Sequence, residues 1–197
     1  MNFLAHAFLA GDDAAYRAGG VIGDFIKGPL PAGLPEDLAA GVALHRALDS
    51  YADRHPAFIA SRTRITPERR RVGGVLVDLF YDHLLARDWA RHGVGPLAAY
   101  AADVYATLDA YADFLPEAAR EVAQLMRQHD WLVSYGRVEA VARTIDRMAR
   151  YRLRQPNHLG GGIEEFLADA EGFAADFRTF LPDASRFCAE WRSRRAV

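Results

Sequence analysis

The chain has 197 residues, of which 51% are hydrophobic and 25% are charged, and its formal net charge at pH 7 is −2. This balance is typical of a soluble globular protein and excludes the disordered and membrane-embedded classes. The small negative charge also argues against nucleic-acid binding driven by overall charge. Since the length suits one domain of ordinary size, we expect a single domain over residues 1–197.

Cysteine usage and the first residues bear on cellular location. Cys188 is the one cysteine of the sequence, so no intramolecular disulfide can form and a reducing compartment is expected. The opening segment "MNFLAHAFLAGDDAAY" has no basic start and reaches Asp12 and Asp13 too early for a secretory signal or a membrane span. The expectation is a cytoplasmic protein with no membrane segment.

Turn signals such as "GPLPAGLP" at 28–35 and "QPNHLGGG" at 155–162 divide the chain into segments with helical periodicity and few β-branched runs. Acidic residues that directly follow Pro35 and Pro67 indicate first turns of helices. The sequence therefore predicts an all-α single-domain helical bundle. Its ten helices are expected near residues 2–10, 14–27, 36–54, 57–64, 67–91, 96–112, 117–129, 135–151, 163–180 and 184–194.

Two of the predicted helices carry polar side chains on faces that are otherwise apolar. His45 and Asp49 are four residues apart, so they share one face of the helix over 36–54. In "VDLFYDHLLARDW", residues 77–89, Asp78 and Asp82 have the same spacing, and His83 lies about 100° further round. Unpaired charges are too costly to bury without a partner, a change of protonation or a metal.

The same pattern recurs near the amino terminus, where His6 lies in an apolar helix and Asp24 stands between Ile22 and Phe25. Each group has an ordinary explanation when taken alone, because a single buried histidine is usually a hydrogen-bonded core residue. Asp49 could likewise pair with a neighbouring arginine. One divalent cation would satisfy all of these groups together, and their number favours a shared metal site.

The ligand types restrict the metal and the chemistry. Imidazole and carboxylate without a usable thiolate suit Mn²⁺, Mg²⁺, Fe²⁺ or Zn²⁺. No glycine-rich phosphate loop, GxSxG elbow or cysteine nucleophile is present. Hydrolysis by a metal-activated water is therefore the leading hypothesis.

Five segments in order carry a family resemblance: "MNFLAHAFLA", "GDFIKG" at 23–28, "GVALHRALDSYADRHP" at 41–56, "VLVDLFYDHLLARDW" at 75–89 and "WLVSYGR" at 131–137. They resemble acyl carrier protein phosphodiesterases, which are regarded as divergent, HD-domain-like, all-helical metal-dependent phosphohydrolases. The resemblance implies removal of the 4′-phosphopantetheine arm from the serine of holo-acyl carrier protein, with Mn²⁺ as the usual metal. It also implies the atypical order Asp82-His83 in place of His-Asp.

Roles are assigned from residue type and spacing. The expected metal ligands are Asp24, His45, Asp78, Asp82 and His83. The expected groups for acid–base catalysis or ligand support are His6, Asp49 and His83. Asp53 and His55, at the end of their helix, are expected to be capping or surface groups.

Arginines form two basic groups that could receive an acidic partner. One is a row at spacings of four, three and four, made by Arg143, Arg147, Arg150 and Arg154. The other is the cluster Arg69, Arg70 and Arg71. Either could be an ordinary solvated face, but acyl carrier proteins are strongly acidic, so we expect docking of holo-acyl carrier protein there.

Two other functions fit the same residues. An HD-type phosphohydrolase for a small phosphate ester or nucleotide would keep the metal site. A non-catalytic helical protein that binds an acidic carrier-like partner would need only the basic surface. The sequence makes no prediction of oligomeric state.

Overall fold

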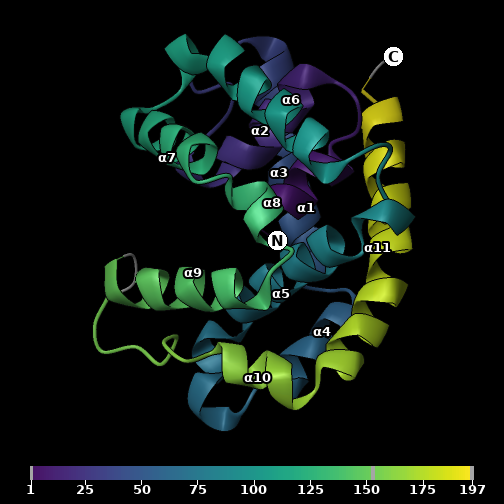
Figure 1. The fold of residues 1–197 in the computed structure, drawn as a ribbon. Coiled ribbons are helices and arrows are strands. Elements are labelled where there is room, and N and C mark those ends of the chain that lie inside the picture. Colours follow the sequence, from purple (N-terminus) through teal and green to yellow (C-terminus); the bar gives the residue numbers. More distant parts are fainter. Residues whose placement is uncertain (1, 152–153, 196–197) are drawn as a thin grey trace.

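The computed structural model describes residues 2–151 and 154–195, and within these ranges every regular element is a helix (Figure 1). The all-α prediction is therefore confirmed. The α-helices are α1 (Phe3–Leu9), α2 (Ala14–Ile22), α3 (Glu36–Ala52), α4 (Pro56–Arg64), α5 (Gly73–Arg87), α6 (Leu97–Ala110), α7 (Glu117–Gln128), α8 (Trp131–Ser134), α9 (Val138–Tyr151), α10 (Ile163–Ala168) and α11 (Ala170–Ser193). Short 3₁₀ turns are η1 (Gly23–Phe25), η2 (Pro67–Val72), η3 (Trp89–Arg91) and η4 (Ala112–Phe114).

Most predicted helices agree with the structure to within a few residues at their ends, and the remaining differences concern three segments. The segment expected as one helix over 67–91 begins as η2, continues as α5 and finishes as η3. The turn of α8 was not predicted, because four residues are too few to show a periodicity.

The prediction of a helix break at residues 181–183 is wrong. α11 passes through Pro182 without ending, and the break lies instead at Asp169, whose side chain accepts a hydrogen bond from the Gly172 amide at 3.1 Å. Phe180, Leu181 and Ala184 beside the proline are all buried. Their burial offsets the backbone hydrogen bond that an interior proline removes.

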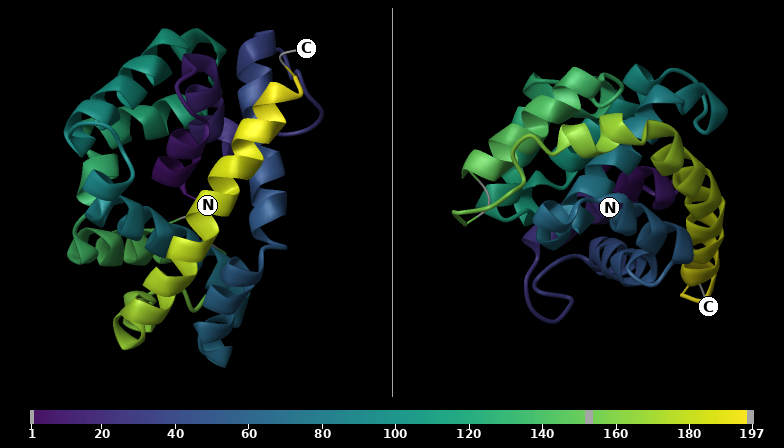
Figure 2. Two further views of the ribbon diagram at one scale, coloured as in Figure 1. Left: turned by 90° about the vertical axis from the view of Figure 1, so that its right-hand side faces the viewer. Right: turned by 90° about the horizontal axis from the view of Figure 1, so that it is seen from below.

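The long helix α11 runs along one side of the molecule and crosses α3, α4 and α5, while α1 lies at the centre (Figures 1 and 2). A cluster of aromatic side chains fixes α5 against α11: Tyr81 packs its ring 5.1 Å from Phe177 and 5.4 Å from Phe180. The close packing of α5 and α11 therefore gives α1, which contacts both helices, a fixed support.

Two glycines allow α2 and α3 to pack closely. A Cβ on Gly19 would lie 2.5 Å from the Gly41 carbonyl carbon, so neither position has room for a side chain. The close approach brings the end of α2 beside the middle of α3, where His45 lies.

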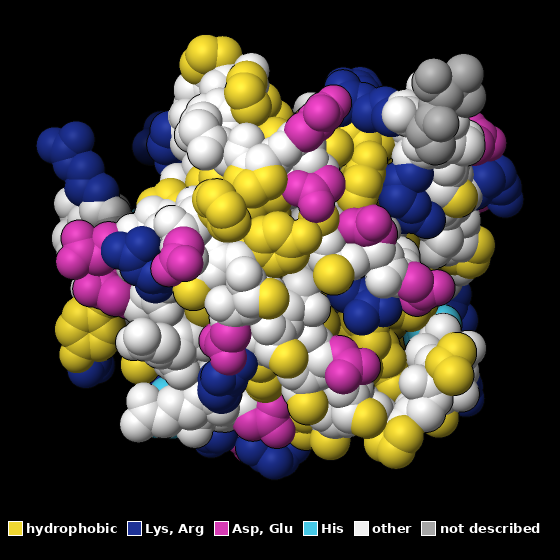
Figure 3. All heavy atoms as spheres, turned by 90° about the horizontal axis from the view of Figure 1, so that it is seen from above, with side chains coloured by type: hydrophobic (Ala, Val, Ile, Leu, Met, Phe, Trp, Pro, Cys, Tyr) yellow, Lys and Arg dark blue, Asp and Glu magenta, His cyan; other side chains and the backbone are white. Residues whose placement is uncertain are grey.

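On the face seen in Figure 3, acidic, basic and apolar side chains are interspersed, so this face presents no continuous field of one charge. No helix in the described ranges is both long enough and apolar enough to cross a membrane.

Candidate metal centre

His45, on α3, uses one of its ring nitrogens for a hydrogen bond to the backbone. Its Nδ1 donates to the Gly20 carbonyl oxygen at 2.8 Å, and the ring is buried. Its Nε2 therefore points toward two carboxylates, 3.1 Å from Asp49 and 3.4 Å from Asp24. A second nitrogen bonded to a backbone carbonyl is the arrangement usual for metal-binding histidines. The predicted common face of His45 and Asp49 is confirmed.

His6, on α1, completes the group from another part of the chain. Its buried ring stacks on His45 with ring centroids 3.8 Å apart and 22° between the planes. Its Nε2 lies 3.0 Å from Asp49 Oδ1, within ion-pair distance. One ligand atom from each of His6, His45 and Asp49 lies within 4.8 Å of the others.

The carboxylates of this group are more exposed than its histidines. Both histidine rings are buried, whereas the side chain of Asp49 is 38% exposed and that of Asp24, in η1, is 73% exposed. Solvent and a substrate phosphate could therefore approach from the carboxylate side.

The two stacked rings differ in charge. Burial opposes the charged form of His45, but the adjacent Asp24 and Asp49 raise its pKa to about 9. Burial and the charge on His45 lower the pKa of His6 to about 3. The contact with His45 lowers the pKa of Asp24, and contacts with both histidines lower that of Asp49 despite its burial. At neutral pH without a metal, one imidazolium and two carboxylates therefore share the site.

This charge state predicts how the metal-free protein responds to alkaline pH. The folded pKa of His45 is above its ordinary value of 6.5, so the stabilisation is full below pH 6.5 and is lost as the pH rises through about 9. In EDTA, the free energy of unfolding should fall by about 2–3 kcal/mol over this range, measured by urea denaturation. His45→Gln should remove most of this slope, and an unchanged slope in that variant would contradict the assignment.

Asp78 lies close to this group, on α5. Burial is the main cause that raises its pKa, and the negative charges of Asp49 and Asp24 add to the rise. Asp78 is not one of the three residues whose ligand atoms lie within 4.8 Å of one another, so its role as a metal ligand stays a prediction.

Asp82 has a different position from the one expected. Its two carboxylate oxygens accept hydrogen bonds from the backbone amides of Leu4 and Ala5, each at 2.9 Å. Burial raises its pKa to about 7, and the two amides oppose this rise because they favour the ionised form. The carboxylate thus caps the start of α1, which satisfies the buried charge without a metal.

His83 also lies outside the His6–His45–Asp49 group. Its Nδ1 donates to the Tyr135 carbonyl oxygen at 2.7 Å, and its ring meets the edge of Phe166 with centroids 5.1 Å apart. Burial lowers its pKa, although the Tyr135 bond opposes the change. Its contacts are those of a hydrogen-bonded core histidine. The rotation of about 100° between adjacent helical residues is the reason that His83 points away from Asp82.

Gly23 is a residue of the centre that sequence reasoning missed. A Cβ at this position would overlap the His45 ring, so the absent side chain is what lets the ring reach its place. Gly20 was missed as well, although it supplies the carbonyl that orients the ring. The run of glycines at 19, 20 and 23 just before Asp24 is the sequence signal that could have found both.

Gly23→Ala should therefore displace His45 without removing a functional group. The backbone conformation suits alanine, with φ −51°, so the effect should come from the ring overlap alone. We expect an overpacking loss of about 1–3 kcal/mol and at least about tenfold weaker Mn²⁺ binding, measured by calorimetry. Gly74→Ala is the matched control, because a Cβ there meets nothing within 4 Å. Equal Mn²⁺ affinity in both variants would show that Gly23 has no part in the centre.

The residues present fit a divalent cation. His6 Nδ1 and Nε2 and His45 Nε2 are buried, and apart from the contacts of the two Nε2 atoms with Asp49 and Asp24 they have no polar partner in the described ranges. Buried polar nitrogens that make no hydrogen bond are costly, and a cation beside Asp49 would satisfy the two Nε2 atoms. Imidazole and carboxylate donors suit Mn²⁺, Fe²⁺ and Zn²⁺.

Fold and site together define an all-α protein with a buried imidazole–carboxylate centre suited to a divalent cation. The chain belongs to the acyl carrier protein phosphodiesterase family, whose model matches residues 1–184. This membership confirms the resemblance and places the chain among phosphoric diester hydrolases.

Curated relatives share this family name over most of the chain. An acyl carrier protein phosphodiesterase of Photorhabdus laumondii is 28% identical over 183 residues, which cover 92% of each chain. One of Pectobacterium atrosepticum is 27% identical over 185 residues, 92% of this chain and 94% of the relative. One of Salmonella dublin is 30% identical over 158 residues, 78% of this chain and 80% of the relative. No solved structure matches the chain, so the HD-like relation stays an implication of the resemblance.

Proposed function

We propose that this protein hydrolyses the phosphodiester that joins 4′-phosphopantetheine to the serine of holo-acyl carrier protein, and so releases apo-acyl carrier protein. The observation that carries the proposal is the His6–His45–Asp49 group, in which the Nε2 atoms of two buried histidines converge on one carboxylate. Family membership supports the reaction class and the substrate. A cytoplasmic location stays a prediction from the sequence.

We assign the cation to His6, His45 and Asp49, with Asp24 and Asp78 beside them. His6 and Asp49 thereby move from the expected acid–base role to that of ligands. Mn²⁺ is proposed ahead of Mg²⁺, because Mg²⁺ prefers oxygen ligands and gives up its waters reluctantly. A divalent cation held here would lower the pKa of a water and neutralise charge on the phosphoryl oxygens.

Asp24 is our candidate to accept the proton of the attacking water. In this hydrolysis, the water oxygen bonds to phosphorus, the phosphorus–serine oxygen bond breaks and the serine oxygen gains a proton. The Asp24 side chain is the most exposed of the acidic group, and the contact with His45 favours its ionised form. Asp24 can therefore contact a water molecule on the exposed side of the metal centre.

We propose that the carrier protein docks on α9, through the basic row Arg143, Arg147 and Arg150. All three side chains are exposed on this helix, which packs on α5, the helix that carries Asp78. The fourth predicted member, Arg154, is exposed but follows the end of α9, and residues 152–153 lie outside the described ranges.

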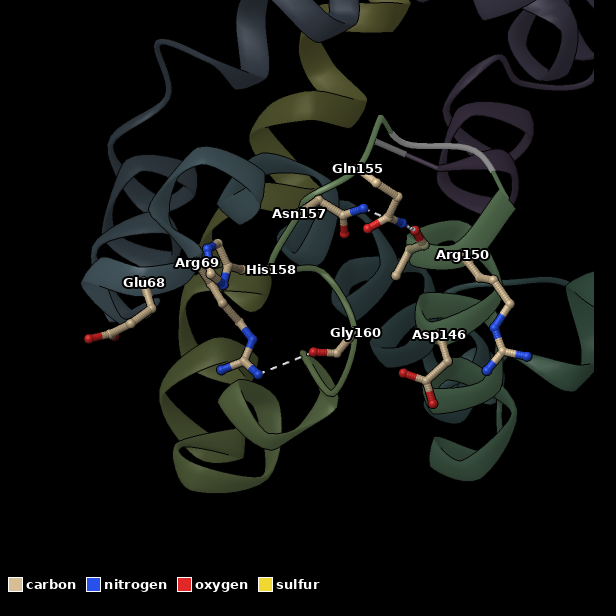
Figure 4. A pocket seen from close by; sticks show the side chains of 9 residues that line it. Glu68, Arg69, Asp146, Arg150, Gln155, Asn157, His158 and Gly160 are labelled. Atoms are coloured by element: carbon tan, nitrogen blue, oxygen red, sulfur yellow. Dashed lines mark hydrogen bonds between the residues drawn. The ribbon is translucent and has the colours of Figure 1, made fainter.

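A cleft of about 630 Å³ lies beside this row, with Arg150 on one side and Arg69 on the other (Figure 4). Arg69 donates to Glu165 and to the Gly160 carbonyl oxygen, each at 3.2 Å, so its charge is largely committed within the fold. Arg70 and Arg71 are exposed and remain in the proposed docking surface.

Reversing two charges of the basic row should weaken docking without affecting chemistry. Arg147→Glu with Arg150→Glu should raise KM for holo-acyl carrier protein by about tenfold at low salt and flatten its salt dependence, because exposed charges are screened within about 8 Å at physiological salt. Steady-state kinetics at several salt concentrations would measure this. Metal content and hydrolysis of a small phosphodiester, if accepted, should not change.

The matched control for this pair is Arg186→Glu with Arg194→Glu, which reverses two exposed arginines of the α11 region. If the α9 pair and the control pair leave KM equally unchanged, the row is a solvated face and Arg70 and Arg71 become the next candidates.

The proposed function itself is tested by mass spectrometry. Purified protein and Mn²⁺ should convert holo-acyl carrier protein to the apo form, with a mass loss of one phosphopantetheine unit. Hydrolysis of small phosphate esters or nucleotides without that mass loss would favour the HD-type phosphohydrolase. Tight binding of the carrier without any turnover would favour the non-catalytic reading.

A further inference from the structure

We propose that Asp82 and Arg192 are positioning residues that hold α1 at its two ends and so place His6 against His45 and Asp49. The inference rests on the proposed function in one respect, namely that His6 serves as a ligand. Neither residue contacts the centre, so each would act through the helix.

The helix α1 needs support from outside itself. It has seven residues, and helices this short are unstable alone because the first turn is costly to form. Asn2, at the N-cap position, makes no capping bond, and its side-chain amide donates to the Tyr135 hydroxyl at 3.1 Å instead. The free amides of the first turn therefore require another acceptor.

Asp82 supplies that acceptor from α5, 77 and 78 residues away in sequence. It is fully buried, and its oxygens bind the amides of Leu4 and Ala5 individually, each at 2.9 Å. An acidic group at the positive end of a helix is the favourable sign. The pair of bonds fixes both the position and the rotation of the first turn.

At the C-terminal end of α1, Arg192 donates hydrogen bonds to free backbone carbonyls. Its Nη1 donates to the carbonyl oxygens of Leu9 at 2.8 Å and Ala10 at 2.9 Å. The next residue, Gly11, has φ +83°, and a Cβ there would lie 3.0 Å from the guanidinium carbon. A cation at the negative end again has the favourable sign.

His6 lies between these two attachments, and its side chain makes few polar contacts of its own. Its Nε2 lies 3.0 Å from Asp49 Oδ1 and its Nδ1 has no hydrogen-bond partner in the described ranges, so the ring is kept by this contact, by stacking on His45 and by the backbone that carries it. Since Asp82 and Arg192 come from α5 and α11, the aromatic contacts between those helices set the distance between the two attachments. Arg192 also lies beyond residue 184, where the family match ends.

If Asp82 and Arg192 position His6, their substitutions should change metal binding, whereas a purely stabilising role would change only the free energy of unfolding. Asp82→Asn keeps one acceptor oxygen but puts an amide against the second backbone donor, and Arg192→Met keeps bulk without donors. Each should weaken Mn²⁺ binding, measured by calorimetry, by about tenfold or more, the effect usual for groups that orient metal ligands. Arg192→Lys should recover part of the affinity, because a lysine keeps the charge and can donate to a carbonyl.

Glu165→Gln and Arg194→Met are the matched controls. Glu165 is a buried carboxylate that accepts from the Thr66 amide at 3.0 Å, far in sequence from α1, and Arg194 is exposed at the end of α11. Glu165→Gln should lower stability as Asp82→Asn does, yet leave Mn²⁺ affinity within about twofold of wild type, since uncoupled sites act additively.

A spectroscopic readout keeps the inference independent of the metal. In EDTA, the NMR resonances of the His6 and His45 rings should shift in Asp82→Asn and Arg192→Met but not in the controls, because the ring stacking would change. Unshifted rings, or Mn²⁺ affinities equal to that of Glu165→Gln, would overturn the inference. If wild type binds no Mn²⁺, the proposed function fails and the ring resonances alone decide this point. Should Asp82→Asn fail to fold, the Arg192 variants carry the test.

Discussion

His45→Gln should lower kcat/KM for holo-acyl carrier protein by at least about 10³-fold, since it removes both a ligand and the charge balance around the reacting phosphate. The Nε2 atom lies within 3.4 Å of both Asp24 and Asp49, so its loss would leave both carboxylates without this positively charged neighbour. The variant should also lose bound Mn²⁺, measured by metal analysis after desalting. Steady-state kinetics on the carrier protein would give the rate loss.

His83→Gln decides between the sequence-based and the structure-based assignment. The structure ties His83 to the Tyr135 carbonyl, so this variant should lose less than about tenfold in rate, in line with one buried hydrogen bond. His129→Gln, at an exposed position, controls for the substitution itself. A loss at His83 equal to that at His45 would return His83 to the catalytic group.

The pairing of His45 with Asp49 could be read from the sequence because a spacing of four is local to one helix. The stacking of His6 on His45 could not, since it depends on the packing of α1 and α2 against α3. Local periodicity therefore identified the polar faces, while tertiary contacts decided which of them meet.

Asp82 shows why a buried carboxylate alone is ambiguous. A cation and the amide groups at the start of a helix can both satisfy a buried negative charge. The sequence around Asp82 does not distinguish these two partners. The amides of Leu4 and Ala5 are contributed by a segment far along the chain. The sequence predicted that the buried Asp82 needs a polar partner, but only the fold shows that this partner is the pair of amides in α1.

Pro182 shows the same competition in the fold itself. Proline favours a helix end locally, whereas the buried residues on both sides favour continuity, and the packing prevails. The place of Arg154 in the arginine row stays a prediction, because helical spacing predicts a common face only within one helix and Arg154 lies outside α9 (Val138–Tyr151).

Removing divalent cations should abolish hydrolysis altogether. The Nε2 atoms of His6 and His45 and the Asp49 carboxylate form one group, and none of these side chains alone supplies an activated water at neutral pH. Excess EDTA should therefore reduce turnover of holo-acyl carrier protein to background. Adding Mn²⁺ beyond the chelator should restore it at least as well as Mg²⁺, because two of the three closest ligands are imidazoles.

The restoration should itself depend on pH in a fixed direction. Because the His45 pKa is about 9, both of its ring nitrogens carry a proton in the metal-free protein at neutral pH. Mn²⁺ binding at Nε2 must therefore release one proton. Mn²⁺ affinity should rise by up to about tenfold per pH unit between pH 7 and 9, measured by calorimetry in buffers of different ionisation enthalpy. Gly74→Ala should follow the wild-type curve, whereas Gly23→Ala should bind weakly at every pH because its ring is displaced. Full activity in excess EDTA would remove the metal from the proposal, and the reaction would then have to rest on Asp24 and the two histidines alone.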